Sequence, residues 1–213
     1  MLFNFRGHLT GFIFSAFLIF NCVVSVADEL PAISFYTNFA GMHFVDQSGR
    51  PFNPSRYLGK VTLFNFIYTK CSNVCPTQTK QLVEVYKTLP KSYQDNIVFV
   101  TISLDSQFDK PQVLKKYAQK MGVEFSNWPF VSGTYEDIKD LQEKLFLFGN
   151  PVNPSHPKID ITQLKTKQKE DVLKNHMTIL WVVDKKGLLI QRYAAAPMDV
   201  ARLEKELQQI SDI

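Results

Sequence analysis

The sequence lacks several features that would point to particular classes of protein. It has no block of lysine and arginine with interleaved aromatic residues, and its formal net charge is only +4. Both observations argue against nucleic-acid binding. It has no internal repeat, no low-complexity tract and no composition shift after residue 28. The chain is therefore expected to form one domain, residues 28–213, behind a separate N-terminal segment.

Ligands for metals are also scarce, with 3 cysteines and 4 histidines among 213 residues. The remaining composition is that of an ordinary soluble globular protein, 45% hydrophobic and 21% charged. The 18 phenylalanines and 8 tyrosines supply ample material for a core.

Residues 1–27 have the pattern of a secretory signal peptide. Arg6 precedes an apolar stretch at about residues 9–26, and the small residues Ser25 and Ala27 form a cleavage signature before Asp28. An uncleaved membrane anchor is the alternative, although the stretch is short for a span and contains Asn21. Cleavage places the protein in an exported, oxidising compartment, which in a bacterium is the periplasm or the outer face of the inner membrane.

The rest of the chain alternates strand and helix patterns. Nearly unbroken apolar runs at residues 61–69 and 96–104 predict strands that are buried on both faces of a sheet. Residues 76–89 and 109–122 follow them with helical spacing, and Gly122 is the predicted end of the second helix. Such alternation predicts the α/β class.

Further elements complete the predicted sheet. They are a β-hairpin at residues 42–60, a strand at 128–133, a helix at 134–149 that Thr134 begins, a long polar loop at 150–174, a strand–turn–strand at 177–196 and a closing helix at 199–210. A loop of that length inside a compact domain is often functional.

Cys71 and Cys75, followed by Pro76, lie directly after the first central strand and at the start of a helix. This placement is thioredoxin-like, and the backbone N–H groups of a helix start favour thiolate over thiol. Residues four apart on a helix lie about 6 Å apart on one face. The two sulfurs can therefore form a disulfide or bind one metal ion.

A third metal ligand has to come from the histidines. His8 leaves with the signal peptide, His43 is expected on the surface and His156 in a solvated loop. His176 precedes the strand whose start faces the cysteine helix in a thioredoxin-like sheet. Two thiolates and one imidazole suit copper or zinc. Structural zinc usually has four protein ligands and no fourth is evident, which favours copper.

The chain resembles the Sco/SenC family of copper-binding, thioredoxin-fold proteins linked to cytochrome c oxidase assembly. The similarity runs from about residue 44 to residue 210 and is carried by the segments GKVTLFNFIYTKCSNVCPTQ, ISLDSQFDKPQVLKKYAQ, WPFVSGTYEDIKDLQEKLFLFG and HMTILWVVDKKGLLIQRY. The resemblance implies a thioredoxin-like fold with an added N-terminal β-hairpin. It also implies that Cys71, Cys75 and His176 bind a copper ion.

Two acidic residues follow the second central strand. We expect Asp109 to cap the helix that starts near Pro111. Asp105 is a candidate for an auxiliary role, either near the metal or in orienting His176.

Three functions remain open at this point. The first is an exported copper metallochaperone that delivers copper to a partner copper site, which the resemblance implies is in cytochrome c oxidase. The second is a thiol–disulfide oxidoreductase that reduces a partner's cysteines through Cys71 and Cys75 as a redox pair. The third is a binding module in which the two cysteines form an inert disulfide. Dithiol exchange has no need of His176, so that histidine favours the metal-binding function.

Overall fold

The computed structural model describes residues 33–145, 165, 179–194 and 197–213. The predicted signal peptide, His156, His176 and all of the predicted polar loop except Lys165 lie outside these residues. Within the described part of the chain, no helix combines the length and apolar character needed to cross a bilayer.

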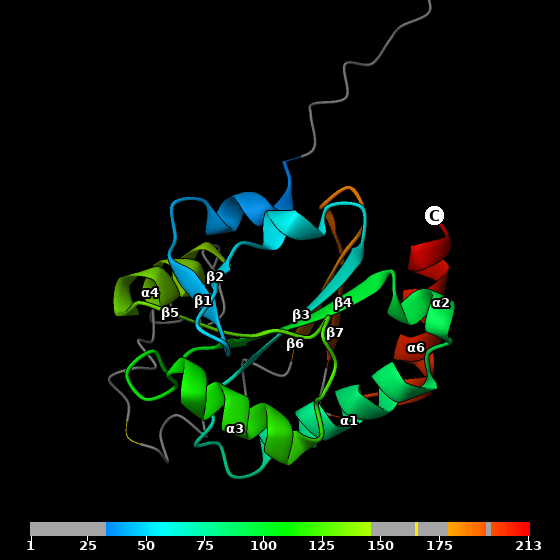
Figure 1. The fold of residues 1–213 in the computed structure, drawn as a ribbon. Coiled ribbons are helices and arrows are strands. Elements are labelled where there is room, and N and C mark those ends of the chain that lie inside the picture. The colour runs from blue at the N-terminus through cyan, green and yellow to red at the C-terminus, as the bar shows by residue number, and fades with distance from the viewer. Residues whose placement is uncertain (1–32, 146–164, 166–178, 195–196) are drawn as a thin grey trace, which may run out of the picture. The chain divides into compact units, whose positions relative to one another are not determined.

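A seven-stranded mixed sheet forms the centre of the domain, with strand order β2-β1-β5-β4-β3-β6-β7 (Figure 1). Its strands are β1 (Phe44–Asp46), β2 (Pro51–Phe52), β3 (Val61–Ile67), β4 (Ile97–Ser103), β5 (Phe130–Gly133), β6 (Ile179–Val183) and β7 (Leu189–Ala194). The helical elements are η1 (Phe35–Phe39), η2 (Pro54–Tyr57), α1 (Val74–Thr88), α2 (Lys91–Gln94), α3 (Pro111–Met121), α4 (Tyr135–Lys144) and α6 (Val200–Asp212).

The strand directions give the sheet a parallel centre with antiparallel edges. β3, β4 and β5 run parallel, while β6 pairs antiparallel with β3, and β1 pairs antiparallel with both β5 and β2. α1 and α3 cover one face of the sheet, and η1 and η2 lie on the other (Figure 1). The predicted α/β class is confirmed.

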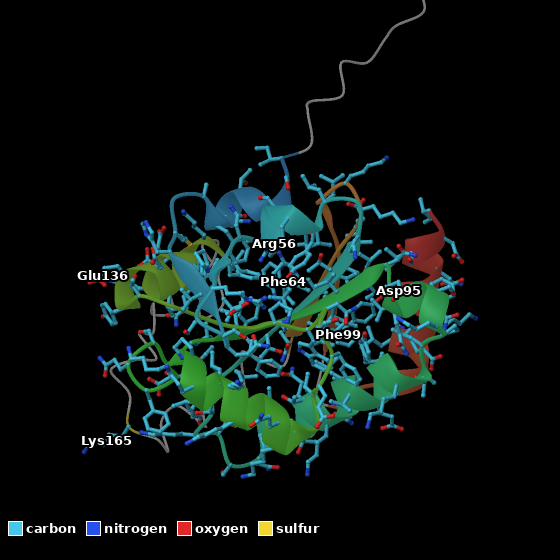
Figure 2. All side chains as sticks on the ribbon, viewed as in Figure 1. Arg56, Phe64, Asp95, Phe99, Glu136 and Lys165 are labelled. Atoms are coloured by element: carbon cyan, nitrogen blue, oxygen red, sulfur yellow. The ribbon has the colours of Figure 1, made fainter. Side chains whose placement is uncertain are left out.

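Every residue of β3 and β4 is buried, as the apolar runs predict. Phe64 and Phe99, labelled in Figure 2, belong to two aromatic clusters. Phe64 stacks on Phe39 of η1 at 5.7 Å between ring centroids, whereas Phe99 meets Trp128 edge-on at 4.8 Å. Such rings bury large apolar areas, so the two clusters fix the helical layers against the sheet.

Two predicted helix boundaries are confirmed. α3 ends at Gly122, which takes the left-handed conformation (φ 79°) that a residue without a Cβ adopts easily. α4 begins after Thr134, whose hydroxyl accepts the backbone N–H of Asp137 at 3.1 Å. The predicted end of that helix at Gly149 lies outside the described residues.

The pairing of β1 with β5 leaves no room for a side chain at Gly133. This residue is the register partner of Phe44, and a Cβ placed on it would lie 2.8 Å and 2.9 Å from Cε1 and Cδ1 of the Phe44 ring.

Gly133→Ala should therefore lower the free energy of unfolding by about 1–3 kcal/mol, the usual cost of overpacking a core. Urea denaturation followed by circular dichroism measures this change. In a Phe44→Leu background the same substitution should cost less, and an equal cost in both backgrounds would contradict the steric explanation.

Candidate metal centre

The two cysteines lie where β3 passes into α1, but only one of them is helical. Cys75 is the second residue of α1, whereas Cys71 lies in the preceding loop and donates its backbone N–H to the Tyr68 carbonyl at 3.1 Å. The expectation of an i,i+4 pair on one helical face is wrong in this respect. The helix begins at Val74, so Cys71 approaches Cys75 through the loop.

Both thiols are free and buried, with 6% of Cys71 and 3% of Cys75 exposed. The Cys75 backbone N–H donates to the Cys71 sulfur at 3.2 Å. Asn73, the residue at the N-cap position of α1, makes no side-chain capping bond. The first N–H groups of a helix have no partner within it, so the Cys71 sulfur does here what a capping side chain normally does.

This arrangement separates the acidities of the two thiols. The Cys75 thiol, together with the backbone N–H groups of Cys75, Asn73 and Val74, lowers the pKa of Cys71 to about 6 in spite of its burial. The pKa of Cys75 is raised, because its thiol donates to Cys71 and is buried beside the Cys71 and Asp109 charges. At neutral pH the pair therefore holds a Cys71 thiolate and a Cys75 thiol.

The structure tests one of the candidate histidines. His43 has 87% of its side chain exposed and lies beside Asp137 of α4, which confirms its expected place on the surface. Among the described residues, no three or more histidine, cysteine, aspartate or glutamate side chains gather into a possible metal site. Cys71 and Cys75 supply two adjacent donors, and His176 as the third ligand remains a prediction.

The expected capping role of Asp109 is wrong. The N-cap position of α3 is Lys110, with no side-chain capping bond. The Asp109 carboxylate instead accepts the backbone N–H of Thr69 at 2.8 Å and the hydroxyls of Thr69 and Ser103, each at 2.5 Å. Donors from the loop after β3 and from the last residue of β4 thus bind the carboxylate in place of the helix N–H groups. Thr69 lies 40 residues away along the chain, so no local pattern in the sequence indicates the contact.

Asp105 organises the turn that leads to Asp109. Its carbonyl accepts the Asp109 backbone N–H at 2.8 Å, and its carboxylate accepts that of Phe108 at 3.3 Å. Its own backbone N–H donates to the Ser103 hydroxyl at 3.1 Å. These contacts give Asp105 a local structural role, and its auxiliary role at a metal remains a prediction.

The SCO1/SenC family model matches residues 35–211. The chain belongs to the SCO1/SenC family. It is 32% identical over 104 residues to the SCO1 protein homolog of Bacillus subtilis, covering 48% of this chain and 53% of that protein. It is 26% identical over 149 residues to a SCO2-like protein of Rickettsia prowazekii, covering 70% and 65%. The mitochondrial SCO2 protein of Saccharomyces cerevisiae is 24% identical over 168 residues, covering 79% and 51%. The chain thus spans about half to two thirds of the length of these relatives.

Solved structures of Sco proteins share the fold. A SCO1/SenC family lipoprotein of Bacillus anthracis superposes with a TM-score of 0.62 at 24% identity, covering 79% of this chain and 92% of that one. BsSco, a cytochrome c oxidase assembly protein with a disulfide switch, gives 0.60 at 23%, covering 80% and 91%. Copper-bound yeast Sco1 gives 0.60 at 20%, covering 79% and 84%. At these identities the likeness establishes the fold, and it confirms the expected thioredoxin-like class.

The unequal acidities predict that alkylation by iodoacetamide will distinguish the two thiols. In the reduced protein, Cys71 should react with a pH midpoint of about 6, while Cys75 should stay unmodified through neutral pH because its pKa is raised. Cys75→Ala removes the thiol donor that lowers the Cys71 pKa most, so the Cys71 midpoint should rise. Peptide mass spectrometry after timed quenching measures each thiol. Equal midpoints for the two thiols in the wild-type protein would contradict this assignment.

Proposed function

We propose that this chain is an exported copper-binding protein of the Sco type. It takes up copper at Cys71, Cys75 and His176 and passes it to a partner copper site. The observation that carries the proposal is the buried pair of sulfurs, in which the Cys75 thiol and backbone N–H groups together hold the Cys71 sulfur as a thiolate. Family membership and the copper-bound Sco structures support copper as the ion.

The donor set fits a soft ion. Thiolates favour Cu(I), and a ligand must lose its proton before it can bind. Cys71 meets this condition at neutral pH, and Cys75 would release one proton when the metal binds. Both sulfurs lie where β3 passes into α1, so a third donor would complete a three-coordinate site.

The register of β6 supports His176 as that donor. Trp181 of β6 pairs with Phe64 of β3, and the two strands run antiparallel. Ile179, the first residue of β6, therefore lies toward the end of β3 that leads into residues 68–73. These residues contain Cys71 and are called the cysteine loop. His176 precedes Ile179 by only three residues. So short a segment cannot reach far from this end of the sheet, which supports His176 as the third ligand.

The proposed client is a copper site of cytochrome c oxidase, in keeping with the assembly role named for BsSco. In this proposal residues 1–27 direct export and are removed or retained as an anchor, and residues 28–213 form the copper-binding domain. In a bacterium that domain would work in the periplasm or at the outer face of the inner membrane.

The acidity difference between the two thiols favours a second candidate, thiol–disulfide exchange. In this reaction the Cys71 thiolate attacks one sulfur of a client disulfide, forming a mixed disulfide and releasing a client thiolate. Cys75, once deprotonated, attacks the Cys71 sulfur and releases the second client thiolate. The client gains two electrons and the protein ends as the Cys71–Cys75 disulfide, which an external dithiol must reduce before the next cycle.

The substitution His176→Ala separates the two functions. It should weaken Cu(I) affinity by at least about 10-fold, because even the loss of a residue that only orients a ligand typically costs 10- to 100-fold. The disulfide potential should stay close to wild type, since the hydrogen-bond donors that lower the pKa of Cys71 come from residues 73–75. Competition with a Cu(I) chelator and equilibration with glutathione measure the two quantities.

His43→Ala is the matched control, because it removes an exposed imidazole on another part of the domain. It should leave both quantities unchanged. Wild-type copper affinity in the His176→Ala protein would remove this histidine from the proposed site. Loss of client reduction with copper binding intact would favour the oxidoreductase.

A further inference from the structure

Asp109 is a carboxylate with no exposed surface, placed where the proposed function assigns it no role. Burial raises its pKa, so its ionised form is costly unless hydrogen bonds compensate. It does not cap α3, and no ion pair with a cationic side chain neutralises it among the described residues. A buried carboxylate in such a position requires a structural or functional reason.

The Asp109 carboxylate acts only as an acceptor in its side-chain hydrogen bonds. The Thr69 backbone N–H donates to Oδ2, and the Thr69 hydroxyl donates to Oδ1. Ser103 accepts the Asp105 backbone N–H on its hydroxyl oxygen, which leaves its hydrogen for Asp109. An ionised carboxylate accepts all three donors, whereas an amide in its place would turn an NH₂ group toward at least one of them.

A second contact joins the same two loops on the surface. Phe108, the neighbour of Asp109, lies with its ring 3.6 Å from the ammonium of Lys70, the neighbour of Thr69. Two consecutive residues of the β4–α3 loop therefore hold two consecutive residues of the cysteine loop. The interior contact is made by hydrogen bonds and the outer one by a cation–π interaction.

These contacts end one residue before Cys71. The Tyr68 carbonyl, adjacent to Thr69, accepts the Cys71 backbone N–H at 3.1 Å. Beyond Cys71 the chain enters α1, whose first N–H groups bind the sulfur. The position of that sulfur depends on the helix on one side and on the anchored segment 68–70 on the other.

We propose that Asp109 is a positioning residue, which anchors Thr69 and thereby holds the Cys71 sulfur against the N–H groups that begin α1. The reactivity of Cys71 and the geometry of the sulfur pair then depend on Asp109, although Asp109 makes no hydrogen bond to either sulfur. For copper this inference rests on the proposed function, whereas for thiol reactivity it stands on the contacts alone.

A purely electrostatic role for Asp109 predicts a different result. Its negative charge opposes ionisation of Cys75, so removing the charge without moving the loop would not slow the reaction of Cys71. Loss of positioning instead takes the Cys71 sulfur away from its N–H donors and makes Cys71 less acidic. The direction of the change therefore distinguishes the two roles.

The test uses four variants of the reduced protein, each checked for a cooperative urea transition. Asp109→Asn removes the charge and replaces one carboxylate oxygen with an NH₂ donor at nearly constant size. Thr69→Val removes one donor without changing any charge. Thr69→Ser restores that hydroxyl. Asp46→Asn is the matched control, because Asp46 is also buried and accepts two backbone N–H bonds, from Ser48 and Arg50 in the β1–β2 turn.

We expect iodoacetamide to alkylate Cys71 at pH 6 about 3- to 10-fold more slowly in Asp109→Asn, with the pH midpoint raised. Thr69→Val should shift the rate in the same direction by roughly 2- to 3-fold, and Thr69→Ser and Asp46→Asn should match wild type. An unchanged or faster rate in folded Asp109→Asn would overturn the proposal. If Asp109→Asn does not fold, equal rates for Thr69→Val and Thr69→Ser would overturn it.

Cu(I) affinity, measured by chelator competition on the same proteins, adds an independent result. Asp109→Asn should bind Cu(I) at least about 10-fold more weakly than wild type, the usual effect of losing a residue that orients a ligand. If the wild-type protein takes up no copper, the proposed function fails. The alkylation rates then still decide whether Asp109 positions Cys71.

Discussion

The first turn of α1 carries backbone N–H groups that no residue of the helix can satisfy, and the Cys71 sulfur is their acceptor. Together with the hydrogen bond from the Cys75 thiol, which lowers the pKa of Cys71 most, this interaction decides which of the two thiols is ionised. It also requires Cys71 to lie outside the helix, in a loop that has to be held in place. The burial of β3 and the anchoring of residues 69 and 70 by the β4–α3 loop both meet that requirement.

The same interaction accounts for the chemistry that the pair can perform. A thiolate beside a protonated thiol can attack a disulfide, and after loss of the second proton the two sulfurs can bind a soft ion. Metal binding and dithiol exchange therefore start from one ground state. The ligand that would separate them is an imidazole, because exchange between sulfurs does not use one.

The sequence was sufficient for the parts of the fold that depend on local pattern. Apolar runs identified β3 and β4, Gly122 identified the end of α3, and Thr134 identified the start of α4. The position of the two cysteines directly after a buried strand located the site, because residues that follow such a strand must lie at its end in the sheet. Contacts between distant segments were not predictable. Asp109 looked like a cap because Pro111 follows it, yet its partners are Ser103 at the end of β4 and Thr69, 40 residues away along the chain. The exact start of α1 at Val74, which leaves Cys71 outside the helix, was also not indicated by the local sequence pattern.

The proposed copper site consists of two sulfurs and one imidazole. Copper-edge X-ray absorption of the reduced protein, loaded with one equivalent of Cu(I), can identify these ligands. We expect two sulfur neighbours and one nitrogen neighbour from imidazole. We also expect no copper to remain on the protein once the Cys71–Cys75 disulfide has formed, because a disulfide has no thiolate to offer. A copper environment of nitrogen and oxygen alone, or equal copper binding by the oxidised protein, would contradict the proposed site.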